Sequence, residues 1–503
     1  MGQPDAGRYG CDLAGSLQKK EEKRCVTAYR RIERKEKKHM RTCDILIQNA
    51  KVMTDYETIL EQADIAIKDG KILAVIHKRS VGIEEKQDTE NQKLPEKESR
   101  NQEAWTAAQV IDGRDRLFMP GFIDSHMHTG QQLLKGLVLD AKPIIWTRIM
   151  LPFESTLIPE KMKLSAELAA LEMIRQGTSG FIDAGSYFMD EAASVYYESG
   201  LRGCLSWSTM DEDGLPESIA MTAEEAVRLT DELYETWDHK GNLKVAYGLR
   251  ALNSCSDRLV ELAAGHAADR GAILQAHMNE YQGEIDGIIR RNGVRPYEYL
   301  EQMGALSERF LGAHSLLLSE KEKELIKLYQ VKTCHCPFSN CGKAVPDTPD
   351  LLERGISVGL GTDGAAHAGL SLFHEMRIFR SVMNIYHGVP KKNPRIMPAE
   401  SLFQMVLEGG AAALGESGRL GRICEGFHAD LIGIDLCQPH LMPTGNLLHT
   451  IFECADGHDV TDMIVEGKVI TRNRQILTLD EERILYDAEK YRKEQGIEIC
   501  SMQ

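Results

Sequence analysis

The chain has 503 residues and a formal net charge of −16. A chain of this length is too long for one simple core, which favours a large domain together with a smaller one. The negative charge argues against a nucleic-acid partner, which normally meets a basic surface, and no apolar run reaches the ~18–20 residues that span a membrane. The 12 cysteines form no disulfide framework and the N-terminus lacks an apolar signal core, so we expect a cytoplasmic protein.

Residues 1–41 differ in composition from the rest of the chain. The stretch 19–41 is crowded with Lys, Arg and Glu, which is typical of a disordered extension, although a solvated helix or a contact to an acidic partner is an alternative. Met40 stands directly before the first strand-like run. We therefore hypothesise that the native chain starts at Met40.

Two strand-rich segments flank the middle of the chain. The first, residues 42–117, has strand patterns at 44–52, 63–75, 110–113 and 117–119, with an Asp-Gly turn at 69–70 and a polar loop at 79–104. The second, residues 423–503, has strand patterns at 429–435 and 460–471, followed by a helix at 481–495. We expect the two segments to join in one small β-sandwich.

Short apolar runs alternate with amphipathic helical segments between residues 118 and 422. The eight runs lie at 121–128, 180–183, 202–206, 244–248, 273–277, 310–314, 332–335 and 358–363. Repeated βα units predict a parallel sheet, and eight of them predict a closed (β/α)8, TIM-like barrel. The sequence therefore indicates an α/β protein in which a barrel carries a β-sandwich.

Polar residues with metal-binding side chains fall at the ends of these runs. His126 and His128 are two residues apart in one strand, so both imidazoles point to the same side. His277, His314, His335 and Asp363 end later strands. Active sites of such barrels lie at the carboxyl ends of the strands, and convergent imidazoles suit a metal such as zinc.

The ordered motifs of this chain resemble the amidohydrolase superfamily. They are Pro-Gly-Phe-Ile-Asp-Ser-His-Met-His at 120–128, His-x-x-Glu at 277–280, Ala-His at 313–314, His-Cys-Pro-x-Ser-Asn at 335–340, Gly-Leu-Gly-Thr-Asp-Gly at 359–364 and Gly-x-x-Ala-Asp-Leu at 426–431. Within the superfamily the chain is similar to the branch that holds cytosine deaminase, methylthioadenosine and adenosylhomocysteine deaminases, and triazine hydrolases.

This resemblance implies one divalent metal ion, zinc or iron, held by His126, His128, His277 and Asp363. It also implies that Asp363 accepts a proton from the attacking water and that Glu280 protonates a ring nitrogen of the substrate. His314 would contact the attacking oxygen. Such acid–base help contributes ~10²–10⁴-fold to a rate.

Four residues are candidates for substrate binding by the same resemblance. Trp146 would cover the base, Glu154 would accept hydrogen bonds from ribose hydroxyls, and His335 would line the pocket. Arg250 stands where the nucleoside-type relatives have a histidine. The 339–346 loop and His367 also depart from the pattern of that subgroup.

We therefore expect a metal-dependent deaminase that releases ammonia from a nitrogen heterocycle, namely a purine or an adenosine-like nucleoside. One alternative keeps the metal but hydrolyses a cyclic amide or another ring substituent. A non-catalytic barrel that binds a ligand is an alternative of another class. The expected partners are a small heterocycle, water and further copies of the chain in a homo-dimer or larger assembly, with neither nucleic acid nor membrane.

Overall fold

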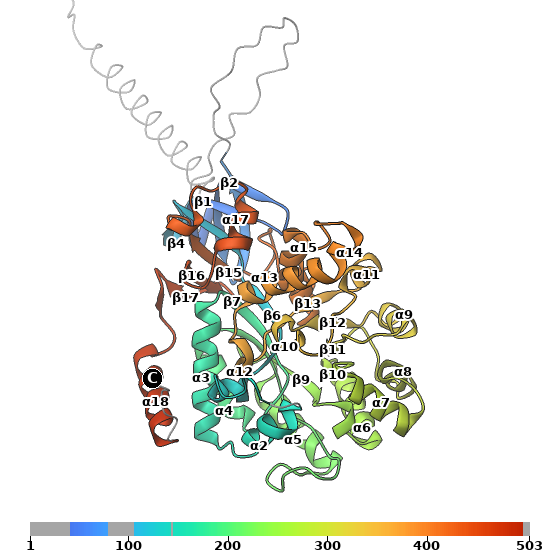
Figure 1. Cartoon of the computed structure of the whole chain (residues 1–503). Helices are drawn as coiled ribbons and strands as arrows, with labels where there is room; N and C mark the ends of the chain where they lie inside the picture. The colour runs from blue at the N-terminus through green and yellow to red at the C-terminus, as the bar shows by residue number, and fades with distance from the viewer. Residues whose placement is uncertain (1–40, 79–104, 142–143, 496–503) are drawn as a thin grey trace, which may run out of the picture.

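The computed structural model describes residues 41–78, 105–141 and 144–495, and they form two nine-stranded sheets (Figure 1). The predicted extension, the hypothesised start at Met40 and the 79–104 loop lie outside the described residues. Within the described ranges, no helix is both long and apolar enough to cross a membrane. The expected fold class, a TIM-like barrel with a separate β domain, is confirmed.

The barrel sheet follows the chain almost strand by strand. Its members are β6 (Phe122–His128), β7 (Thr178–Asp183), β8 (Arg202–Ser206), β9 (Leu243–Leu249), β10 (Leu274–Met278), β11 (Phe310–His314), β12 (Lys332–His335), β13 (Val358–Leu360) and β14 (Asp363–Gly364). β13 pairs with β12 and β14 pairs with β6, both in parallel. The predicted eighth strand is therefore split in two, and its second piece closes the barrel.

Helices cover the outside of the barrel and connect its strands (Figure 1). The longer ones are α3 (Pro159–Arg175), α4 (Met189–Ser199), α5 (Ala223–Trp237), α6 (Asp257–Arg270), α7 (Gln282–Asn292), α8 (Pro296–Gln302), α9 (Glu320–Leu328) and α13 (Leu372–Met383). Two of these helices begin with a side-chain cap. The Thr222 hydroxyl accepts from the Glu225 amide, and Ser319 with Glu322 forms a capping box.

Shorter helical turns lie within the segments that connect the strands and the longer helices. Before β13 these are η2 (Thr129–Leu134), η3 (Trp146–Met150), α2 (Leu151–Glu154), η4 (Leu252–Ser254), α10 (Pro337–Asn340) and α11 (Thr348–Glu353). After β14 they are α12 (Ala365–Ala368), η5 (Asn384–Gly388), α14 (Val389–Lys391), α15 (Ala399–Gln404), η6 (Met405–Gly409), α16 (Gly410–Ala413), η7 (Pro439–Leu441) and α17 (Leu447–Cys454). The turns that follow β6 and β12 position residues of the site described below.

The second sheet joins both ends of the described chain. Its strands are β1 (Arg41–Met53), β2 (Ile59–Lys68), β3 (Lys71–His77), β4 (Trp105–Asp112), β5 (Arg116–Pro120), β15 (Leu431–Asp435), β16 (Val460–Val465), β17 (Lys468–Arg472) and β18 (Gln475–Ile476). β5 pairs antiparallel with β15 and parallel with β1. The layers expected of a sandwich are thus parts of one hydrogen-bonded sheet with its own apolar core. The proposed domain boundaries at 118 and 423 stay predictions, and β5 crosses the first.

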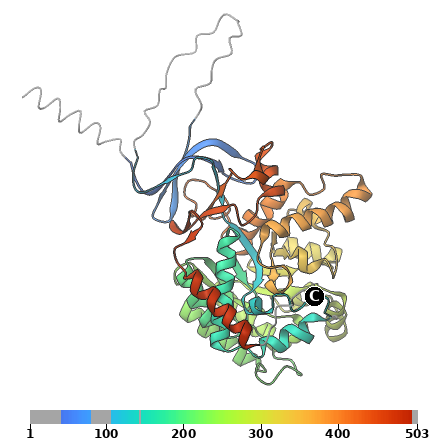
Figure 2. The same ribbon diagram turned by 60° about the vertical axis from the view of Figure 1, so that its left-hand side comes forward.

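Two contacts fix the second sheet and the C-terminal helix to the barrel. The guanidinium of Arg202 on β8 donates to both carboxylate oxygens of Asp430, at 2.8 and 3.1 Å, and also pairs with Glu466. The final helix α18 (Glu481–Glu494) lies along α3, where Arg175 pairs with Glu481 (Figure 2). Both links use residues that are far apart in the sequence.

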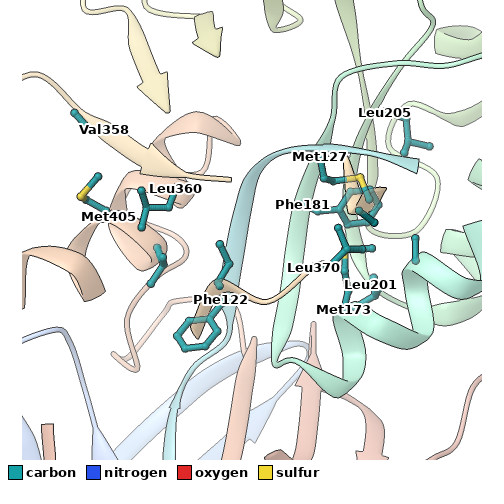
Figure 3. Packing of buried hydrophobic residues seen from close by; sticks show 14 of the residues in the cluster. Phe122, Met127, Met173, Phe181, Leu201, Leu205, Val358, Leu360, Leu370 and Met405 are labelled. Atoms are coloured by element: carbon teal, nitrogen blue, oxygen red, sulfur yellow. The ribbon is translucent and has the colours of Figure 1, made fainter. Parts of the chain in front are cut away.

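Strand β6 runs through the centre of the molecule, and all seven of its residues are buried. Its apolar residues Phe122 and Met127 belong to the main core with Phe181 of β7 (Figure 3). Gly361 lies against the backbone of His126. A Cβ atom on residue 361 would stand only 2.6 Å from the His126 oxygen and 2.8 Å from the His126 nitrogen. A glycine there lets the last strand approach β6 closely, which brings Asp363 to the two histidines.

Candidate active site

A cavity of about 510 Å³ opens at the carboxyl ends of the barrel strands. Its lining includes three of the predicted metal ligands, His128, His277 and Asp363, together with Glu280. This volume lies in the range of small-molecule sites. The cavity lies at the end of the barrel where the sequence predicts the site.

The imidazoles of β6 and β10 meet the carboxylate of β14 at the base of this cavity. The Nε2 atoms of His128 and His277 are 3.2 Å apart, and His128 Nε2 lies 3.3 Å from Asp363 Oδ1. When two nitrogen atoms each lie ~2.0–2.1 Å from one tetrahedral zinc, the two nitrogens are ~3.3 Å apart. His126 Nε2 lies 3.9 Å from Asp363 Oδ1, and neither of its ring nitrogens has a hydrogen-bond partner. These four residues fit a divalent metal ion.

The charge state of the histidines also suits a metal. Burial, together with the neighbouring imidazoles, holds the pKa of His126 and of His277 well below its ordinary value. Neutral imidazoles present a lone pair rather than a positive charge to a cation. The ring centroid of His126 lies 4.7 to 5.0 Å from those of His128, His277 and His314.

Unusual backbone geometry aims two side chains at this cluster. His314, the last residue of β11, has φ 66°, and Asp363, the first of β14, has φ 59°. Non-glycine residues rarely adopt this left-handed conformation, and where they do the strain is often part of a functional site. His314 Nε2 is buried without a hydrogen-bond partner, while its Nδ1 lies 3.0 Å from the Asn340 amide nitrogen.

Glu280 lies beside the cluster and is linked to Asp363 by a hydrogen-bonded chain through Lys343 and Ser339. Its Oε1 is 3.5 Å from His314 Nε2 and pairs with Lys343 Nζ. Lys343 also donates to Ser339 Oγ at 2.9 Å, and Ser339 Oγ donates to Asp363 Oδ2 at 2.6 Å. Burial raises the pKa of Glu280, but His314 and Lys343 outweigh it and hold that pKa below its ordinary value.

The contacts of Lys343 and Ser339 cannot be predicted from the sequence, which marks only the loop that holds them. The 339–346 stretch departed from the pattern of the nucleoside subgroup, and this departure was the one available signal. Asn340 holds the loop by accepting from the Cys336 amide at 2.8 Å.

Glu154 and Arg250 form a buried ion pair beside the cavity. Arg250 Nη2 lies 3.1 Å from Glu154 Oε1, and their side chains are 3% and 1% exposed. Gln131 Nε2 donates to the same Oε1 at 2.7 Å. Among the described residues, Arg250 and Gln131 line the cavity but Glu154 does not. The carboxylate expected to face ribose thus contacts protein groups.

Arg250 also contacts a predicted metal ligand. Its Nη1 lies 2.6 Å from His128 Nδ1. Since a guanidinium only donates, Nδ1 accepts, and a neutral His128 then carries its proton on Nε2. Binding of a cation through His128 Nε2 requires the other tautomer, with the proton on Nδ1, and the Arg250 guanidinium would then have to turn away from Nδ1.

The two remaining predicted substrate residues differ in position. Trp146 lines the cavity, and its ring centroid lies 5.9 Å from the Arg250 guanidinium carbon. His335 is buried, with its ring centroid 5.7 Å from that of Phe379 and its Nδ1 2.7 Å from the His314 carbonyl oxygen, and is not part of the described lining. In this structure His335 therefore contacts the backbone of His314 rather than the cavity, whereas His367 does line it.

Several deaminases of known sequence are similar to this chain over nearly their whole length. A 5'-deoxyadenosine deaminase of Methanosarcina mazei is 31% identical over 90% of this chain and 98% of the relative. A 5-methylthioadenosine/S-adenosylhomocysteine deaminase of Thermococcus onnurineus is 34% identical over 86% of this chain and 95% of the relative.

Solved structures and a family comparison agree with the fold. An adenosine deaminase of Xanthomonas campestris with bound zinc has a TM-score of 0.81 at 25% identity, over 91% of this chain and all of that one. An atrazine chlorohydrolase of Arthrobacter aurescens complexed with zinc has a TM-score of 0.76 at 22% identity, over 89% and 99%, which supports the fold alone. The sequence model of the amidohydrolase family matches residues 117–470. The chain therefore belongs to the amidohydrolase family.

Proposed function

We propose that this protein is a metal-dependent hydrolytic deaminase that releases ammonia from a purine or purine-nucleoside-like heterocycle. The observation that carries the proposal is the placement of Glu280 in one cavity with His128, His277 and Asp363. A ring nitrogen that must be protonated needs such an acid next to the attacking water. The similarity to deaminases over most of the chain supports the same reaction.

The proposed metal is zinc, because the structurally similar adenosine deaminase of Xanthomonas campestris was crystallised with zinc bound. It would be held by His126, His128, His277 and Asp363. When bound, such an ion lowers the pKa of a coordinated water towards ~7 and so supplies hydroxide at neutral pH.

The side chains would then move two protons. Lys343 and His314 keep Glu280 ionised, so Glu280 takes one proton from the attacking water and gives it to the ring nitrogen. A C–O bond forms at the amine-bearing carbon. Asp363 passes the second water proton to the amine, the C–N bond breaks and ammonia leaves. His314 Nε2, which has no protein hydrogen-bond partner, is available to the attacking oxygen.

We also propose a cytoplasmic, homo-oligomeric enzyme. All nine cysteines of the described residues are free, which fits a reducing compartment. Exposed apolar side chains such as Ile385, Tyr386 and Val389 offer a surface for a second copy.

The variant Glu280→Gln tests the proton shuttle. It preserves shape and the metal cluster but removes the proton carrier, so ammonia release should fall by at least ~100-fold while metal content stays unchanged. Glu232→Gln, on an exposed face of α5, is the matched control. Near wild-type ammonia release by Glu280→Gln would overturn the role of Glu280.

A further inference from the structure

The connection between β10 and α7, residues 279–281, is held by a buried carboxyl group of the helix that follows it. Glu284 stands in the first turn of α7 and is 2% exposed. Its Oε1 accepts from the Asn279 amide at 3.1 Å, and its Oε2 accepts from the Glu280 amide at 2.8 Å. One side chain therefore fixes two successive peptide groups, and the second of them belongs to Glu280.

The backbone at this point has a conformation that needs such support. Asn279 has φ 49°, in the left-handed region that few non-glycine residues adopt. This turn leads the chain from the end of β10 to Glu280, which lines the cavity. Backbone strain of this kind persists only where the surrounding groups hold it in place. The two hydrogen bonds of Glu284 are part of that support.

Asn279 is also held from the other side, by residues at the start of α9. Its Nδ2 donates to Glu322 Oε1 at 2.9 Å and to the Leu317 carbonyl oxygen at 3.2 Å. Glu322 is itself buried and forms the capping box of α9 with Ser319. These bonds fix the side chain of Asn279, whereas the bond that reaches the backbone of Glu280 comes from Glu284.

Glu284 occupies a place that does not favour an acid. Burial, together with the nearby charges of Glu280 and Glu322, raises the pKa of Glu284 to about 8 in spite of the two amides that donate to it. A buried carboxyl group beside like charges is unfavourable in its ionised form. The two amides that it holds are therefore the feature that explains an acid at this position.

We propose that Glu284 is a positioning residue for the reaction, which holds the backbone of residues 279 and 280 so that the carboxylate of Glu280 stays in its working position in the cavity. This assignment rests on the proposed deaminase function and adds a residue to it. Glu284 does not itself line the cavity in the part of the chain that the structure describes.

The contacts of Glu280 show what the positioning achieves. Its Oε1 lies 3.5 Å from His314 Nε2 and pairs with Lys343 Nζ. A rotation of the Glu280 backbone would move the carboxylate away from both groups. A displacement of about 1 Å at a reacting group can lower a rate by ~10²-fold.

Glu284→Gln removes one of the two acceptors at nearly constant size. A carboxyl group accepts through both oxygens, whereas the nitrogen of an amide only donates, so one backbone N–H loses its partner. The assay uses the zinc-loaded enzyme with whichever of adenine, guanine, adenosine and 5'-deoxyadenosine the wild type deaminates fastest. We expect kcat to fall by about 10- to 100-fold, with KM within about threefold of wild type and metal content unchanged.

Glu225→Gln is the matched control. Glu225 has the same place in the first turn of α5, but it is exposed and pairs with Arg228. A kcat of Glu284→Gln within about twofold of this control would overturn the assignment. Loss of bound zinc or of the folded state in Glu284→Gln would also contradict it, because the residue would then support the barrel rather than Glu280.

A double-mutant cycle with Glu280→Gln shows whether the effect passes through Glu280. If Glu284 acts by placing the Glu280 carboxylate, the addition of Glu284→Gln to Glu280→Gln should change the residual kcat by less than about twofold. A residue with a merely structural role would lower kcat by the same factor in both backgrounds. That result would overturn the assignment.

Amide hydrogen exchange separates this inference from the proposed function, because it needs no turnover. Exchange at residues 279 and 280 should be at least about 10-fold faster in Glu284→Gln than in the wild type. Faster exchange, with no ammonia released by the wild type from any of the four compounds, would contradict the deaminase and leave the hold on the backbone standing. Ammonia release by Glu284→Gln at the wild-type kcat would keep the deaminase and remove the positioning role.

Discussion

Single side chains set the chemistry of the site, and Lys343 shows how. Its ammonium group links Glu280, through Ser339, to the oxygen of Asp363 that does not face His128. An adjacent cation favours the ionised form of a carboxyl group. Lys343 thereby sets the starting charge of the residue that is proposed to carry the proton.

Replacement of Lys343 by Met should change the pH dependence of the enzyme. Without the ammonium group the pKa of Glu280 rises, because burial then acts with one opposing charge fewer. A higher pKa means that less Glu280 is ionised at a given pH, so the acidic limb of kcat/KM moves to higher pH. A pH–rate profile measures this shift.

The control is Lys321→Met, which removes an exposed lysine of α9. An acidic limb that stays in place in Lys343→Met, or moves to lower pH, would show that Glu280 does not define that limb.

At the scale of elements, the closure of the barrel depends on a buried carboxyl group. Asp124 on β6 accepts from the Thr362 hydroxyl at 2.6 Å, the Thr362 amide at 3.2 Å and the His126 amide at 3.1 Å. Burial raises the pKa of Asp124 to about 7 in spite of these donors. The bonds tie β6 to the break between β13 and β14, where the predicted metal ligands meet.

Thr362→Val should weaken this closure. The change keeps the side-chain shape but leaves one Asp124 oxygen without its hydroxyl donor, which should cost ~1–3 kcal/mol of unfolding free energy. Urea denaturation measures the loss, and Thr236→Val on an exposed face of α5 is the control. Equal stability of Thr362→Val and its control would show that this bond does not hold the barrel closed.

Elements of the fold could be predicted where the signal is local. The runs 202–206, 310–314 and 332–335 coincide with β8, β11 and β12, because short apolar runs between helices indicate buried strands. The alternation of side chains also predicted that His126 and His128 share a direction. The break in the eighth strand could not be predicted, because it depends on the left-handed backbone of Asp363, which pairing with β6 stabilises.

The rest of the site could not be predicted because it depends on contacts between distant residues. Glu154 and Arg250 are 96 positions apart, and the residues around each position do not indicate that the two side chains form an ion pair. Lys343 reaches Glu280 across 63 positions. His335 has a motif position typical of a pocket residue, yet its ring lies near that of Phe379 and its Nδ1 contacts the His314 carbonyl oxygen.

For the molecule as a whole, a buried charge cluster joins the barrel to the second sheet. Arg202 of β8 is 8% exposed and pairs with Asp430 and Glu466, which lie just before β15 and just after β16. Removal of one partner from a buried ion pair is far more costly than the net contribution of the pair, because the remaining charge stays buried.

Arg202→Met should therefore destabilise the protein by roughly 3–5 kcal/mol, since Asp430 loses its buried partner. Chemical denaturation followed by circular dichroism gives this value. Arg228→Met, whose pairs on α5 are exposed, should change stability little. A loss no greater than that of Arg228→Met would show that the cluster does not hold the two sheets together.

The metal dependence of ammonia release tests the central claim most directly. Purified protein is analysed for metal, stripped with a chelator, and assayed with purines and purine nucleosides before and after zinc is returned. We predict that ammonia release disappears with the metal and returns in proportion to the zinc bound, approaching one ion per chain. Full ammonia release by metal-free protein, or none by zinc-loaded protein with any compound, would contradict the account.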